Sequence, residues 1–120
     1  MAEVKLLRAS EAVVQHQEWG ALYWYAGGAV GNSQDMTVGK CVLKPGCENP
    51  PHQHPNCEEV LHVAAGRIVH SVEGKPDVQM GEGDTIVIPS GVPHNARNVG
   101  SEEAVLLIAF SSADRQTRGE

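Results

Sequence analysis

The chain has 120 residues, with 41% hydrophobic and 20% charged side chains and a formal net charge of −6 at pH 7. These values predict one globular domain over residues 1–120 and exclude a disordered chain or a coiled coil. Basic residues form no cluster, and no apolar run is long enough to span a membrane, so we expect neither nucleic-acid nor membrane binding.

From Trp19 onward the chain consists of short apolar, β-branched runs separated by turn residues. We expect strands over residues 19–25, 36–43, 59–65, 67–72, 78–80, 85–88 and 103–110. Only residues 9–12 have a helix-like start, and the polar ending, 111–120, is expected to fray in its last few residues. Short strands at this spacing, without a long helix, predict an all-β sandwich or barrel.

Cysteine usage favours a reducing environment. Cys41, Cys47 and Cys57 are an odd number, and no two lie within a metal-binding or redox motif. The first residues also lack the basic and apolar stretches of a secretory signal, so we expect free thiols and a cytoplasmic location. A metal or reactive-thiol role for Cys57, which lies near a histidine cluster, stays open.

That cluster is the most informative part of the sequence. His52 and His54 are two residues apart, so in a strand both imidazoles lie on one face and can bind one ion. Glu58 and Glu59 follow after a Pro-Asn bend that can bring a carboxylate to the same point. A further histidine, His94, lies just past an expected strand end.

Two spaced motifs contain these residues. The first, over residues 46–66, has Gly, two histidines, Glu and Gly at Gly46, His52, His54, Glu59 and Gly66. The second, over residues 83–98, has Gly, Pro, Gly, His and Asn at Gly83, Pro89, Gly91, His94 and Asn98. Both resemble the signature motifs of the cupin family at every position, in the family's order and with a short connector.

The resemblance implies an all-β jelly-roll barrel, also called a double-stranded β-helix, with a metal ion inside. Carried over position by position, the metal ligands are His52, His54, Glu59 and His94. Three imidazoles and one carboxylate suit one divalent transition metal, namely Mn, Fe, Co, Ni, Cu or Zn, and leave one or two positions for substrate. The choice of metal stays open.

Other polar and aromatic residues have competing interpretations. Lys40 lies in an expected strand, where it either points outward from a sheet edge or binds a substrate carboxylate inside the pocket. His62 falls on the opposite face from Glu59, while His70 and His16 have no motif support. The aromatic run 19–25 favours core packing and a dimer contact.

As to function, the resemblance implies a metal-binding cupin that acts on an oxygen-rich small molecule, either a sugar acid or a keto/enol compound. The reaction would be metal-assisted isomerisation or oxygenation, with no catalytic residue assigned. The ending Phe110-Ser111-Ser112, with Arg115 after it, is similar to that of small cupins linked to uronate ketonisation. The alternatives are a metal-bearing binding or sensing cupin without turnover, and a cupin that has lost its metal. We expect a homodimer, as short cupins usually pair.

Overall fold

The structure, a computed structural model, describes residues 3–119 and is almost entirely β. Its one helical element is the short 3-10 turn η1 (Ala9–Glu11). The strands are β1 (Val13–Gln17), β2 (Gly20–Ala26), β3 (Thr37–Leu43), β4 (His52–Gln53), β5 (Glu59–Ala65), β6 (Ile68–Val72), β7 (Val78–Met80), β8 (Thr85–Ile88), β9 (His94–Asn98), β10 (Ala104–Phe110) and β11 (Arg118–Gly119). Within residues 3–119, no helix is long and apolar enough to cross a membrane.

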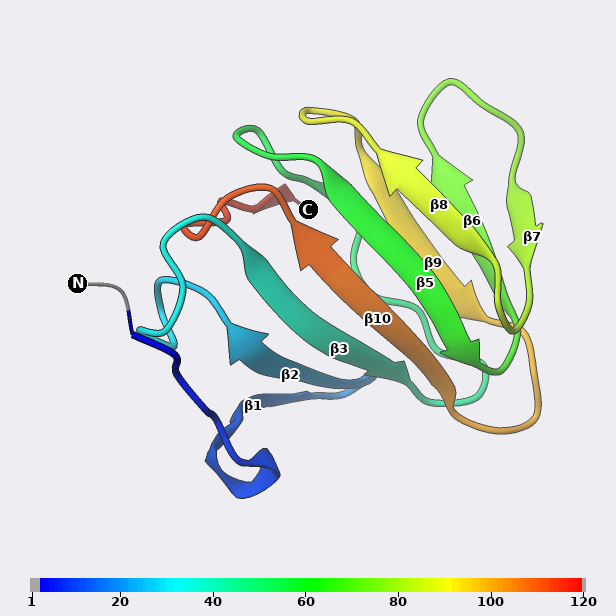
Figure 1. The fold of residues 1–120 in the computed structure, drawn as a ribbon. Coiled ribbons are helices and arrows are strands. Elements are labelled where there is room, and N and C mark those ends of the chain that lie inside the picture. Colours follow the sequence, from blue (N-terminus) through cyan, green and yellow to red (C-terminus); the bar gives the residue numbers. More distant parts are fainter. Residues whose placement is uncertain (1–2, 120) are drawn as a thin grey trace.

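The strands form two antiparallel sheets that pack face to face. The six-stranded sheet has the order β1-β2-β3-β10-β5-β8, and the five-stranded sheet has the order β11-β4-β9-β6-β7. Figure 1 shows the larger sheet across the front of the molecule, with β6, β7 and β9 at the back beyond β5. This double-sheet arrangement confirms the predicted all-β jelly roll.

Alternating burial along the strands builds the core between the sheets. In β3 and β10, buried residues alternate with more exposed ones, because successive side chains point to opposite faces. The largest fully buried apolar side chains come from both sheets and are Leu43, Val63, Ile68, Ile88 and Leu106. The predicted strands therefore follow from hydrophobic alternation and agree with the observed bounds to within one residue at either end.

Four strands were not predicted, because hydrophobic alternation does not reveal them. In β9 the inward residues His94, Ala96 and Asn98 are buried, but two of the three are polar. The edge strand β1 is exposed along its whole length. β4 and β11 have two residues each and are defined by pairing, β4 with both β9 and β11.

The C-terminal segment differs from the expectation of a frayed tail. The Thr37 hydroxyl donates to the Ser112 carbonyl at 2.7 Å, and Asn56 Nδ2 donates to the Asp114 carbonyl at 2.7 Å. The segment then pairs with β4 through β11. Residues 112–119 are thus held against the barrel, and Glu120 lies outside the described residues.

Candidate metal centre

Four predicted ligands converge at one point between the sheets. His52 in β4 is the direct strand partner of His94 in β9, and His54 follows β4 immediately. Glu59 comes from the opposite sheet, at the start of β5. One ligand atom from each of the four lies within 4.8 Å of every other, and all except the half-buried His52 are buried.

Each imidazole is oriented by a backbone carbonyl. In all three histidines the Nδ1 atom lies within hydrogen-bond distance of a carbonyl oxygen, which can only accept a proton. The pairs are His52 with Pro50 at 2.8 Å, His54 with Gln116 at 3.0 Å and His94 with Val92 at 2.8 Å. The proton therefore sits on Nδ1, and Nε2 is the nitrogen that can bind a metal.

Glu59 supplies the negative charge of the site. Its Oε1 lies 3.2 Å from Nε2 of His54 and 2.9 Å from Nε2 of His94. Burial would raise the pKa of this carboxyl, but the hydrogen bonds and charges of the two imidazoles outweigh burial and lower its pKa to about 2. Glu59 is thus ionised, as a metal ligand must be.

The imidazoles of His54 and His94, which face Glu59, show why a metal cation fits between the four residues. Nε2 of His54 is buried, and apart from its contact with Glu59 it has no hydrogen-bond partner within residues 3–119. Burial lowers the pKa of His94, but its hydrogen bond to Glu59 and the Glu59 charge outweigh burial and raise it, so positive charge at this point is favoured. Three imidazoles and a carboxylate suit a divalent transition metal. The four residues form a potential site for one such ion.

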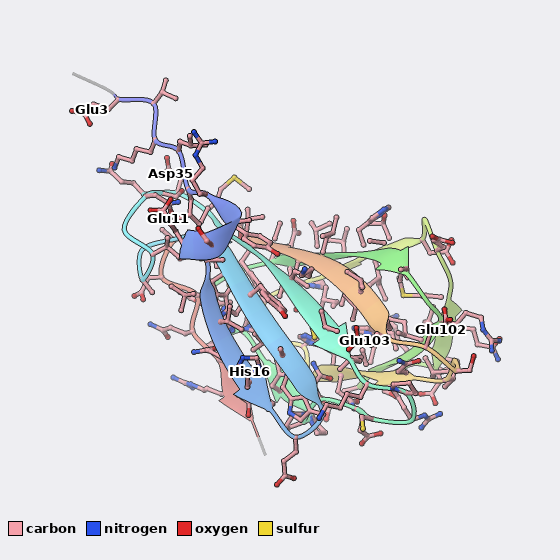
Figure 2. All side chains as sticks on the ribbon, turned by 90° about the horizontal axis from the view of Figure 1, so that it is seen from below. Glu3, Glu11, His16, Asp35, Glu102 and Glu103 are labelled. Carbon is pink, nitrogen blue, oxygen red and sulfur yellow. The ribbon has the colours of Figure 1, made fainter. Side chains whose placement is uncertain are left out.

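The remaining histidines lie in three different environments. His70, for which the sequence suggested no role, is buried, and its ring stacks on that of His94 at 5.6 Å between centroids and 16° between planes. It therefore packs behind a proposed ligand. His62 lies on the outer face, as predicted, with Nδ1 2.8 Å from the Thr85 hydroxyl. His16 is exposed on the edge strand β1 (Figure 2).

A cavity of about 320 Å³ opens beside the site. His52, His54 and Glu59 line it together with mostly apolar side chains, which include Trp19, Leu22, Trp24, Leu61, Leu106, Ile108 and Phe110. Its polar lining further includes Asn49, Arg115 and Thr117. The inner face of the predicted aromatic run thus forms part of the cavity wall.

Lys40 is not part of this cavity. β3 lies between β2 and β10 rather than at an edge, and Lys40 points away from the core with its Nζ 4.3 Å from the ring centroid of Tyr23. The side chain is on the outer face because its neighbours Gly39 and Cys41 face inward. The cation that lines the cavity is Arg115.

The three cysteines are free, as expected. Cys57 is buried in the core and is not among the residues of the potential metal site. Cys41 lines the cavity, and burial, with a smaller effect of the Glu59 charge, raises the pKa of its thiol to about 12. That thiol is therefore protonated at neutral pH and is a weak nucleophile.

The fold and the four-residue site define a metal-binding cupin. Residues 39–110 match the family model described as the cupin domain, and the chain belongs to that family. The matched segment contains both motifs that carried the resemblance.

Curated relatives are similar to part of this chain. A germin-like protein 3-8 of Oryza sativa subsp. japonica is 39% identical over 85 residues, which cover 68% of this chain and 38% of that protein. Oxalate oxidase 1 of Hordeum vulgare is 32% identical over 88 residues, covering 68% and 44%. The chain therefore spans less than half the length of these relatives.

Solved structures share the fold. A recombinant oxalate oxidase in complex with glycolate has a TM-score of 0.77 at 25% identity, covering 87% of this chain and 56% of that one. The oxalate decarboxylase of Lactobacillus farciminis in a formate complex has a TM-score of 0.83 at 20% identity, covering 92% and 34%. The second likeness concerns the fold alone.

Proposed function

We propose that this cupin is a metal-dependent dioxygenase that cleaves the enol form of a small keto compound. The observation that carries the proposal is the composition of the cavity. Among the described residues that line it, the only ionisable groups other than the proposed metal ligands are Cys41 and Arg115. Neither group can exchange protons readily at neutral pH, since the Cys41 pKa is raised to about 12 and an arginine keeps its proton.

This composition favours oxygenation over isomerisation. Keto–enol isomerisation moves a proton between carbon and oxygen, so it needs a side chain that can take and return that proton. Glu59 is held by two imidazoles at 2.9 and 3.2 Å, and its lowered pKa keeps it ionised as a ligand. Oxygenation of a molecule that is already an enol requires no such exchange.

The proposed reaction is balanced without an added reductant. A bound divalent metal would act as a Lewis acid for the enol oxygen and a neighbouring carbonyl oxygen. The enol carbon–carbon double bond breaks and O₂ accepts four electrons from its two carbons. One oxygen atom enters a carboxylic acid and the other enters an aldehyde. The apolar wall around Trp24, Leu106 and Phe110 excludes water from the reacting carbons.

The comparisons support a small oxidisable substrate. One similar protein is named an oxalate oxidase, and one structural neighbour is an oxalate oxidase in complex with glycolate. A cavity of about 320 Å³ is at the small end of ligand pockets. It suits a molecule of a few carbon atoms rather than a polymer.

Oxygen uptake tests the proposal. Protein loaded separately with Mn, Fe, Co, Ni, Cu or Zn is mixed with acetylacetone or acetylpyruvate, two enolised probes. We expect uptake with at least one metal and label from ¹⁸O₂ in both products. His52→Ala should abolish uptake, whereas His62→Ala, a matched change on the outer face, should not. Binding without uptake at full loading would support a sensing protein instead, and turnover of unsaturated uronates without O₂ would support an isomerase.

We also propose that the chain forms a homodimer through the outer face of the six-stranded sheet. Leu107 in β10 is 44% exposed and Val87 in β8 is 53% exposed, although both are large apolar side chains. Val38, Val42 and Val60 are half-buried in the same sheet, at positions that alternate with core residues. Ala109 of β10 pairs with Val38 and Val60, and Val60 pairs with Val87, so apolar side chains form a row across this face. Exposed apolar surface of this kind favours association. Light scattering should give a dimer at micromolar concentration, and Leu107→Glu should give a monomer; a monomeric wild type would contradict the proposal.

A further inference from the structure

Arg115 has an unusual position for a cation. Its guanidinium carbon lies 4.3 Å from the ring centroid of Trp24 and 5.1 Å from that of Phe110, so the group rests on two aromatic faces that line the cavity. Nη1 donates a hydrogen bond of 2.6 Å to the Thr117 hydroxyl. These contacts fix the plane of the guanidinium while leaving most of its five N–H donors without a partner within residues 3–119.

Arg115 has no direct ion-pair partner among residues 3–119. Within residues 3–119, no carboxylate oxygen lies within 4.0 Å of its guanidinium nitrogens, the two ion pairs being those between Glu59 and the histidines. Burial disfavours the charged form and lowers the pKa of this guanidinium. Arg115 is half-buried, and a cation in such a position is favoured by an anionic partner, because desolvating an unpaired charge is costly.

A bound metal ion would add further positive charge to the cavity. A divalent ion with the Glu59 carboxylate would leave one net positive charge at the metal centre, and Arg115 adds a second in the same apolar cavity. In such a low-dielectric space each positive charge attracts an anion strongly. A ligand with two negative groups would satisfy both.

The spacing of the two centres limits the length of that ligand. The Phe110 ring centroid lies 5.1 Å from the Arg115 guanidinium carbon and 4.9 Å from the ring centroid of His54. The guanidinium carbon is therefore at most about 10 Å from the His54 imidazole, with an aromatic ring between them. A short hydrocarbon segment across Phe110 would connect a metal-binding group to a group at Arg115.

We infer that Arg115 binds a substrate carboxylate, and that the substrate is a short keto or enol acid whose carboxylate is separated by a few carbon atoms from the oxygens that bind the metal. The inference rests on the proposed function, because it assumes that the substrate binds the metal through oxygen. Arg115 is then a specificity-determining residue. It takes the carboxylate-binding role that the sequence offered as one of two interpretations of Lys40.

Binding without turnover tests this role. The Zn²⁺-loaded protein is titrated calorimetrically with 2-oxoglutarate and 2-oxoadipate, and with 2-oxopentanoate and 2-oxohexanoate, which lack the second carboxylate. All four bind metals through the 2-oxo acid group. We expect the better dicarboxylate to bind about 10- to 100-fold more tightly than its monocarboxylate partner, the effect of one hydrogen-bonded charge pair.

Variants separate the role of Arg115 from that of the metal. Arg115→Met should remove the preference for the dicarboxylate without changing the zinc stoichiometry, and Arg115→Lys should keep part of it. Arg67→Met, at an exposed arginine between β5 and β6, is the matched control and should keep the full preference. Thermal unfolding of each variant confirms that the fold is intact.

These measurements distinguish a failure of the proposed function from a failure of the inference about Arg115. If no 2-oxo acid binds more tightly with zinc than without it, both the oxygen-binding metal centre and the inference fall. If the acids bind in a zinc-dependent manner but without preference for a second carboxylate, the inference is wrong and the proposed function stands. A preference that persists in Arg115→Met likewise overturns the role of Arg115.

Discussion

Acid should destabilise the metal-free protein through His70. This side chain is 1% exposed, and its Nδ1 is buried without a partner within residues 3–119. Burial and the neighbouring His94 charge lower its pKa from 6.5 to about 4. In the unfolded chain His70 keeps its ordinary pKa, so below that value the unfolded state binds the proton and the folded state does not. Stability is therefore fully present above about pH 6.5 and is lost as pH falls toward 4.

The size of the loss follows from the shift. Each pKa unit corresponds to about 1.4 kcal/mol, so a shift from 6.5 to about 4 corresponds to a loss of about 3 kcal/mol. Small domains unfold with about 5–15 kcal/mol, so this single group accounts for a measurable part of the total.

Urea unfolding in the presence of a chelator measures the effect between about pH 7 and pH 4.5. His70→Phe keeps an aromatic ring against His94 but cannot bind a proton. We expect its unfolding free energy to fall less steeply than that of the wild type, with the difference between the two changing by about 2–3 kcal/mol over this range. His16→Phe, at an exposed position, should follow the wild type. Parallel curves for His70→Phe and the wild type would refute the assignment.

Three further substitutions test the site and its supports. Glu59→Gln removes the anionic ligand of the potential metal site. Loss of a residue that only orients a ligand typically lowers metal affinity by roughly 10- to 100-fold, so calorimetry should show at least this reduction. Unchanged affinity would exclude a ligand role for Glu59. Gly39→Ala places a Cβ 2.6 Å from Cε3 of Trp24 and should cost about 1–3 kcal/mol in urea unfolding, whereas Gly81→Ala, with nothing within 4 Å, is the control; equal midpoints would contradict this clash. Asn98→Ala leaves two backbone carbonyls without their donor and should cost about 1–3 kcal/mol; a loss below about 0.5 kcal/mol would show that water replaces the amide.

The sequence by itself determined the fold class and the set of candidate ligands, because both depend on local patterns. Hydrophobic alternation fixes which face of a strand is buried, and it predicted β5, β7 and β8 with their observed bounds. The spacing of His52 and His54 places both rings on one side of the chain, and the resemblance to the cupin motifs implies Glu59 and His94 as the further ligands.

Only the tertiary structure decided what surrounds those ligands. The sequence offered Lys40 as a possible cation in the pocket, but β3 is a central strand and turns Lys40 outward. Arg115 reaches the cavity because the C-terminal segment folds back across the barrel and rests on Trp24, a residue far away in the chain. His70 likewise meets His94 only through the pairing of β6 with β9. Contacts between distant segments depend on strand order and packing, which residue spacing does not encode. The sequence therefore predicted the four residues of the potential metal site, while the fold identified the cation beside them.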